Sequence, residues 1–256
     1  MLICKLFLYK DYYLYRNMDK EKIIISEDTV KRIVKDIKDV IINKDDFKKN
    51  RIYYNHDENN ILKGYILIIG PTNTPYAHGF YFFEINFSTN YPFTPPTLIF
   101  NTNDGVTRFN PNLYKNGKVC LSILNTWKGE QWTSCQTLRS ILLTLVSILN
   151  NEPLTNEPGI TTKHKDFNNY NKILTYKNLY FSLYKQLFEN KINPTFKLFY
   201  NDMKEYYNNN KKEIINNINN LIIEYPTQEI ITVSTYKMEC KINYKELLDL
   251  FLKIEI

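Results

Sequence analysis

The chain has 256 residues, of which 43% are hydrophobic and 15% are aromatic, and this composition excludes a mostly disordered protein. The formal net charge is +6, but the lysines are scattered among acidic residues, whereas nucleic-acid-binding domains usually cluster their basic residues. No apolar run approaches the ~20 residues that span a bilayer. We therefore expect no nucleic acid and no membrane among the partners.

Cysteine and histidine usage argues against a metal centre. The three histidines have no ligand spacing, and the cysteines form no Cys-x-x-Cys pair. Without a signal peptide, the cysteines also argue against a disulfide framework. We expect a reducing compartment, which means the cytoplasm or nucleus, or the host cytoplasm if the chain is viral. The cysteines are Cys4, Cys120, Cys135 and Cys240.

The first 17 residues are predicted to be a leader outside the main fold. Their apolar run is short, is interrupted by Lys5 and lacks a small-residue cleavage site, so it is a poor signal peptide. Met18 lies just before the first clear structural element. Translation from Met18 would omit the leader.

A helix is predicted to begin after Ser26. This serine is a good N-cap, and Glu27 and Asp28 supply the acidic residues that a helix N-terminus favours. Apolar residues then recur at helical spacing as far as Ile41. The opposite face is basic and is either solvated or a docking surface for an acidic partner. It carries Lys31, Arg32, Lys35 and Lys38.

Four strand-like runs follow and predict an antiparallel meander. They cover residues 51–54, 62–69, 80–87 and 97–100, and the third has at least one aromatic face. Between the third and fourth runs lies Tyr91-Pro92-Phe93-Thr94-Pro95-Pro96. Proline excludes a continued helix or a central strand, so this segment must form an extended, stiff corner.

Residues 110–121 form a polar, turn-rich loop that ends on a cysteine inside an apolar run. Pro111 restricts the backbone, and Asn116-Gly117 is a strong turn dipeptide. Asn112 precedes Cys120 by eight residues, so an amide and a thiol could meet on one surface. From the pattern alone Cys120 is either a nucleophile or a small buried residue.

A second helix is predicted over residues 138–149, followed by a proline-punctuated loop over 151–159. The remainder changes character, with three helical patterns at 173–187, 196–207 and 214–222, then a strand-like alternation at 236–242. Asn243 with Glu246 resembles a capping box before a last helix. We expect an α+β core over residues 18–165 and an appended, mostly helical region over 166–256.

In this order, these elements resemble the ubiquitin-conjugating enzyme family, from about Ser26 to Gly159. That resemblance implies a fold with an N-terminal helix, a four-stranded antiparallel meander and C-terminal helices. The segments 108–112 and 156–159 are similar to those of a larger-than-average branch whose members carry helical C-terminal extensions. The shared motifs are Gly70-Pro71, Thr74-Pro75-Tyr76, Gly79, Tyr91-Pro92-Phe93, Pro95-Pro96, Pro111-Asn112, Gly117, Cys120-Leu121, Ile123-Leu124 and Trp132.

The resemblance implies a role for five residues. Cys120 matches the thioester-forming cysteine, and Asn112 matches the asparagine whose amide stabilises the oxyanion during transfer. Glu157 falls where the family places an acidic residue that orients or deprotonates the incoming lysine. Phe93 matches the loop residue that ligases grip, and Cys135 lies in the second ligase-facing loop.

Three departures accompany these matches. The family's His-Pro-Asn triplet reads Asn110-Pro111-Asn112, so the histidine that supports the loop is missing. The loop between Cys120 and Trp132 is longer than in minimal members. The usual Trp-Ser-Pro reads Trp132-Thr133-Ser134, which affects the expected ligase preference.

The function implied is that of an acyltransferase that carries ubiquitin, or a ubiquitin-like protein, as a Cys120 thioester. The implied partners are an activating enzyme, ubiquitin ligases and lysine-bearing substrates, with Lys31, Arg32 and Lys35 as docking residues. No cofactor is expected, because ATP is consumed upstream by the activating enzyme. One alternative is a catalytically inactive scaffold of the same fold that binds ubiquitin or ligases. Another is a cysteine hydrolase, which would need His78 or His164 as a partner.

Overall fold

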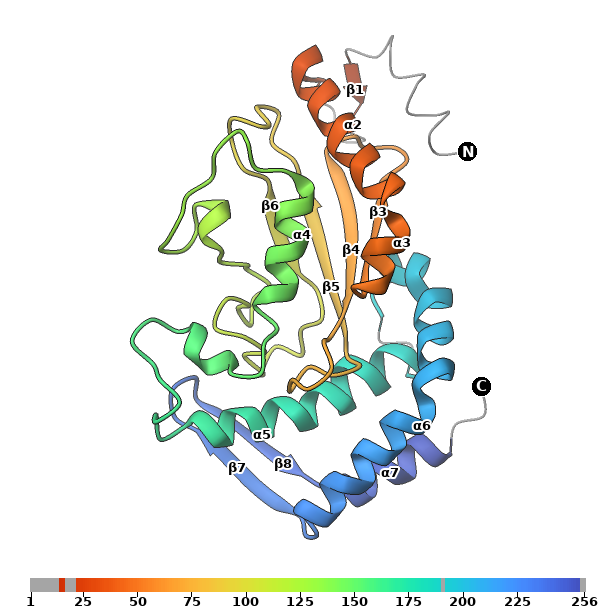
Figure 1. The fold of residues 1–256 in the computed structure, drawn as a ribbon, viewed down its shortest axis with the longest axis vertical. Coiled ribbons are helices and arrows are strands. Elements are labelled where there is room, and N and C mark those ends of the chain that lie inside the picture. The colour runs from red at the N-terminus through yellow and green to blue at the C-terminus, as the bar shows by residue number, and fades with distance from the viewer. Residues whose placement is uncertain (1–13, 17–21, 190–191, 254–256) are drawn as a thin grey trace.

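The computed structural model describes residues 14–16, 22–189 and 192–253 (Figure 1). Most of the predicted leader, with Cys4 and Met18, lies outside the described residues. Within them, β1 (Leu14–Arg16) pairs antiparallel with β2 (Lys22–Ile24) just ahead of the first helix.

The first predicted helix is α2 (Glu27–Ile42), and a short helix, α3 (Lys44–Lys49), follows it. The hydroxyl of Ser26 accepts a hydrogen bond from the Thr29 backbone amide at 3.1 Å, which confirms the N-cap. Asp36, on the same helix, is buried and accepts hydrogen bonds from the Tyr91 hydroxyl and the Leu138 backbone amide. One carboxylate therefore ties α2 to the proline corner and to α4 (Leu138–Ser147).

The predicted meander is confirmed as one antiparallel sheet. Its strand order β3-β4-β5-β6 follows the chain. The β1–β2 pair precedes this sheet, and a second two-stranded hairpin follows it near the C-terminus (Figure 1). The strands of the main sheet are β3 (Ile52–His56), β4 (Lys63–Ile69), β5 (Phe80–Asn86) and β6 (Thr97–Phe100).

Strand β5 is buried on both faces, with at most 1% exposure from Phe80 to Phe83. The Phe83 ring contacts Phe100 on one face, with centroids 5.4 Å apart. On the other face, Phe82 lies 5.0 Å from the Phe196 ring. Since Phe196 belongs to the appended region, that region packs against this face of β5, where the Tyr206 ring also contacts Phe80.

The appended region differs in two ways from the expectation. The two helices predicted at 196–207 and 214–222 are wrong, because a 3₁₀ turn (Pro194–Phe199) leads into a single 25-residue helix, α6 (Tyr200–Glu224). Its buried residues Met203, Tyr207, Ile214 and Ile218 form one stripe along the helix. Most of the polar residues between them lie on the side of the helix that faces solvent. The strand β7 (Glu229–Val233) was not predicted.

The other appended elements follow the sequence pattern. The predicted helix at 173–187 appears as α5 (Phe167–Lys177), continued by a π-helical stretch (Asn178–Lys185). The predicted alternation appears as β8 (Met238–Ile242), which pairs with β7. The Asn243 side chain caps α7 (Tyr244–Leu252) by accepting from the Glu246 amide at 3.2 Å.

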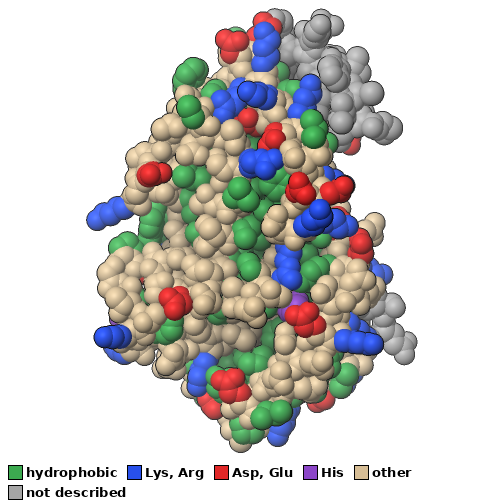
Figure 2. All heavy atoms as spheres, viewed as in Figure 1, with side chains coloured by type: hydrophobic (Ala, Val, Ile, Leu, Met, Phe, Trp, Pro, Cys, Tyr) green, Lys and Arg blue, Asp and Glu red, His purple; other side chains and the backbone are tan. Residues whose placement is uncertain are grey.

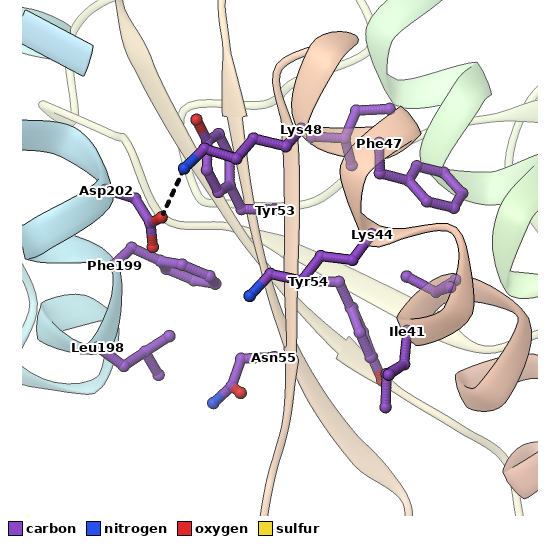
Figure 3. Close-up of a pocket in the computed structure, with 12 residues that line it drawn as sticks. Ile41, Lys44, Phe47, Lys48, Tyr53, Tyr54, Asn55, Leu198, Phe199 and Asp202 are labelled. Carbon is purple, nitrogen blue, oxygen red and sulfur yellow. Dashed lines mark ion pairs between the residues drawn. The ribbon is translucent and has the colours of Figure 1, made fainter. Parts of the chain in front are cut away.

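A cavity of about 170 Å³ marks one seam between the core and the appended region (Figure 3). Residues of α2, α3 and β3 line one side, and Leu198, Phe199 and Asp202 line the other. Lys48 bridges the seam with ion pairs to Asp202 at 3.9 Å and to Glu205 at 3.1 Å. On the face drawn in Figure 2, basic and acidic side chains are interspersed.

Candidate active site

Asn110 supports the loop that carries the candidate catalytic residues. It is fully buried, and its amide nitrogen donates to the Tyr76 hydroxyl at 2.9 Å and to the Ile148 carbonyl at 2.7 Å. Its amide oxygen accepts from the Asn112 backbone at 2.9 Å and from the Asn156 side chain at 3.3 Å. Asn110 therefore makes buried hydrogen bonds that support this loop, at the position where the resemblance implies a histidine.

We expect Asn110→Ala to lower the free energy of unfolding by about 2–3 kcal/mol, because it leaves buried donors and acceptors unpaired. The matched control is Asn116→Ala in the same loop, where the side chain is exposed and accepts one bond, from the Lys118 amide. Urea unfolding of both variants measures the difference. Ordinary surface substitutions change the free energy of unfolding by about 0.5 kcal/mol or less. A change of that size for Asn110→Ala would contradict the supporting role.

Asn112 and Cys120 lie side by side, joined by two reciprocal hydrogen bonds. The Cys120 amide donates to the Asn112 carbonyl at 2.9 Å, and the Asn112 side-chain nitrogen donates to the Cys120 carbonyl at 2.7 Å. Both residues are nearly buried, with exposures of 2% for Cys120 and 5% for Asn112. The structure thus brings together the amide and the cysteine that the sequence singled out.

Arg108 holds the turn that leads into this pair. Its guanidinium donates to the Asn110 carbonyl at 3.1 Å and to the Pro111 carbonyl at 2.6 Å. The same group stacks on the Tyr114 ring, 3.3 Å from its centroid. Because both bonds end on backbone carbonyls two and three residues away, Arg108 stabilises the loop conformation. Arg108 lies in the family-like segment 108–112, but its role in supporting the loop was not predicted from the sequence.

Glu157 lies in the loop after a 3₁₀ turn (Pro153–Asn156) and is half-buried. One of its carboxylate oxygens accepts a hydrogen bond from the Tyr236 hydroxyl at 2.6 Å. Burial, and next the hydrogen bond to Glu157, raise the pKa of Tyr236 above its ordinary value. Tyr236 was predicted only as part of a strand-like alternation, and no signal along the chain connects two residues 79 positions apart.

The residues predicted to meet ligases are gathered at one end of the core. Phe93 is 74% exposed, and Cys135 is also exposed. The indole of Trp132 donates to the Pro92 carbonyl at 2.6 Å and so joins the two loops that carry them. Arg32 adds a second connection, from α2 to the Ser134 carbonyl at 2.8 Å.

The basic face of α2 divides into two kinds of residue. Lys31 and Lys35 are exposed, and Lys31 forms an ion pair with Glu27 at 2.6 Å. Arg32 is only 21% exposed and pairs with Asp36 at 3.1 Å, besides binding backbone carbonyls. Its guanidinium therefore serves the fold, while docking through Lys31 and Lys35 stays a prediction.

Each histidine has a hydrogen-bond partner other than Cys120. His56 bonds the Tyr54 hydroxyl at 2.7 Å, and burial lowers its pKa to about 4. His78 bonds the Tyr206 hydroxyl, and His164 accepts from the Asp166 amide. A cysteine–histidine pair of the hydrolase type is absent from the hydrogen bonds of the described residues.

The described part of the chain contains free thiols but neither a metal-binding cluster nor a membrane-spanning helix. Cys120, Cys135 and Cys240 are free thiols there. No cluster of three or more histidine, cysteine or carboxylate side chains in that part is arranged to hold a metal ion. None of its helices combines the length and the apolar character that crossing a membrane requires.

Comparisons with known proteins point in one direction. The family model described as ubiquitin-conjugating enzyme matches residues 32–179. Ubiquitin-conjugating enzyme E2 Z of Xenopus tropicalis is 40% identical over 126 residues, which cover 48% of this chain and 40% of that protein. The Homo sapiens E2 Z is 39% identical over 126 residues, covering 48% of this chain and 36% of that protein.

A third relative is much longer. The dual E2 ubiquitin-conjugating enzyme/E3 ubiquitin-protein ligase BIRC6 of Homo sapiens is 52% identical over 102 residues, covering 37% of this chain and 2% of that protein. The match thus spans 40% or less of each of these relatives. The family match itself covers more than half of the chain, and the observed sheet and helices agree with it. This chain belongs to the ubiquitin-conjugating enzyme family.

Proposed function

We propose that this chain is an acyltransferase that accepts ubiquitin, or a ubiquitin-like protein, from an activating enzyme and passes it to a lysine or a ligase. The observation that supports this most is the pair of reciprocal hydrogen bonds between Asn112 and Cys120. It sets a side-chain amide beside the single cysteine of that loop, within the family fold.

Charging is an exchange between two thioesters. Cys120 Sγ, as the thiolate, attacks the carbonyl carbon of the incoming thioester, and a new S–C bond forms there. The bond to the activating enzyme's sulfur breaks, and that sulfur leaves as a thiolate. The acyl group stays at the same energy level, so the step needs neither ATP nor a cofactor at this site.

Transfer replaces the S–C bond with an amide. The lysine Nζ attacks the same carbonyl, the N–C bond forms, and Cys120 leaves as a thiolate. The tetrahedral intermediate carries an oxyanion, and the amide of Asn112 has two N–H donors, of which the Cys120 carbonyl uses one. The other is the donor proposed for the oxyanion. The amine proton passes to Glu157 or to solvent.

We expect Asn112→Asp to slow transfer to free lysine by about 10²–10³, because a carboxylate cannot donate to the oxyanion. Single-turnover discharge of the purified thioester measures this rate. Asn116→Ala, in the same loop, is the control and should discharge like the unmodified chain. A discharge rate for Asn112→Asp within threefold of the unmodified chain would remove Asn112 from the proposed mechanism.

Phe93 and Cys135 are proposed as contacts for ligases, and Lys31 and Lys35 as contacts for an acidic partner such as the activating enzyme. Their exposure at one end of the core supports this assignment.

The decisive experiment offers the chain ubiquitin and several ubiquitin-like proteins, each with its activating enzyme and ATP. A reducing-agent-sensitive adduct with at least one of them is the expected result. The alternative of an inactive scaffold predicts no adduct with any modifier, together with measurable non-covalent binding of ubiquitin or a ligase.

A further inference from the structure

The turn between β7 and β8 reaches back to the candidate active site. Asp166, a buried carboxylate, anchors this turn. It accepts hydrogen bonds from the hydroxyls of Ser234 and Thr235 and from the Thr235 amide, with distances of 2.8 Å or less. Burial alone would raise the pKa of Asp166, but these hydrogen bonds outweigh it and lower the pKa below its ordinary value. The anchor is therefore a carboxylate at neutral pH.

A second set of contacts fixes the same turn against the catalytic loop. Lys115 donates to the Tyr236 carbonyl at 3.0 Å. The Arg108 guanidinium lies 5.3 Å from the centroid of the Tyr236 ring, and the Arg108 amide donates to Met238 Sδ at 3.1 Å. The turn is held on both sides, so the direction of the Tyr236 side chain is set by the fold.

That direction leads to Glu157. The Tyr236 hydroxyl donates to Glu157 Oε2 at 2.6 Å, and Tyr236 is half-buried while making this contact. A carboxylate has two oxygens and about four lone-pair sites, so one bond from a phenol leaves Oε1 able to accept from an amine. Without Tyr236, the flexible side chain of Glu157 could sample several rotamers.

We propose that Tyr236 is a positioning residue for aminolysis, which holds Glu157 so that its second carboxylate oxygen faces the incoming lysine. This inference rests on the proposed function, and it makes the appended hairpin part of the acceptor side of the site. In the step concerned, the lysine nitrogen forms the N–C bond, the Cys120 S–C bond breaks, and a proton leaves the amine towards Glu157 or water.

The test separates charging from two kinds of discharge. Tyr236→Phe removes only the hydroxyl, and Tyr225→Phe is the matched control, because Tyr225 also donates to a glutamate, Glu224, at 2.5 Å elsewhere in the appended region. We expect Tyr236→Phe to charge normally and to slow discharge onto free lysine by about three- to tenfold, the scale of a lost orienting contact. Discharge by dithiothreitol, a thiol that needs no carboxylate, should be unchanged.

A double-mutant cycle shows whether Tyr236 acts through Glu157. Glu157→Ala should slow lysine discharge at least as much as Tyr236→Phe, and adding Tyr236→Phe to Glu157→Ala should have no further effect. Additive losses, equal losses in Tyr225→Phe, or faster lysine discharge in Tyr236→Phe would each overturn the inference while leaving the proposed function standing. An unmodified chain that charges with no modifier would overturn both.

Discussion

Cys120→Ala should abolish the reducing-agent-sensitive adduct with ubiquitin or with whichever ubiquitin-like protein charges the chain. The reason is chemical, since the exchange needs a sulfur nucleophile at this position and alanine offers none. Cys120→Ser should behave differently, because a hydroxyl can form only an oxygen ester. Any adduct of that variant should therefore survive treatment with dithiothreitol. Non-reducing and reducing gel electrophoresis of the same reactions measures both results.

The other described cysteines provide the controls for this experiment. Cys135 is exposed and Cys240 is buried in β8, where burial raises the pKa of its thiol. Cys135→Ala and Cys240→Ala should both charge like the unmodified chain. If Cys120→Ala still forms an adduct that depends on Cys135, the assignment of the nucleophile is wrong.

Truncation after Lys165 should give a chain that fails to fold. The cut removes Phe196 and Tyr206, whose rings lie 5.0 Å from Phe82 and 6.3 Å from Phe80 across one face of the sheet. Burying a large apolar side chain stabilises a protein by roughly 1.5–3 kcal/mol, so exposing Phe80 and Phe82 alone costs roughly 3–6 kcal/mol. That loss is a large part of the whole stability of a typical domain, about 5–15 kcal/mol. Circular dichroism and urea unfolding of the soluble fraction measure the outcome.

Point variants test the same face without removing the region. Phe82→Ala should lower the free energy of unfolding by about 3–5 kcal/mol, the range for a buried aromatic ring. Tyr200→Ala, at a ring that is 37% exposed, should change it by less than about 1 kcal/mol. A truncated chain that unfolds cooperatively would contradict the packing argument. If that chain also charged where the full chain did not, the appended region would be an inhibitor.

Individual elements of the core and of the appended region were predictable where their signals are local. The N-cap at Ser26, the alternation in β8 and the cap at Asn243 all act within a few residues of one another, and each was confirmed. The sequence predicted two helices where the structure has the single helix α6. The polar residues in the middle of α6 resemble a loop in the sequence, because the continuity of the buried stripe on either side of them is visible only in the structure.

At the site, the sequence by itself determined the eight-residue separation of Asn112 and Cys120 and the turn residues between them, which allow the pairing that the structure shows. Only the tertiary structure decided that Asn110 carries the support expected of a histidine, because its partners Tyr76 and Ile148 are distant along the chain. The contact between Tyr236 and Glu157 is of the same kind. Hydrogen bonds between distant segments depend on how the chain returns to itself, and such a return leaves no periodicity in the sequence to be recognised.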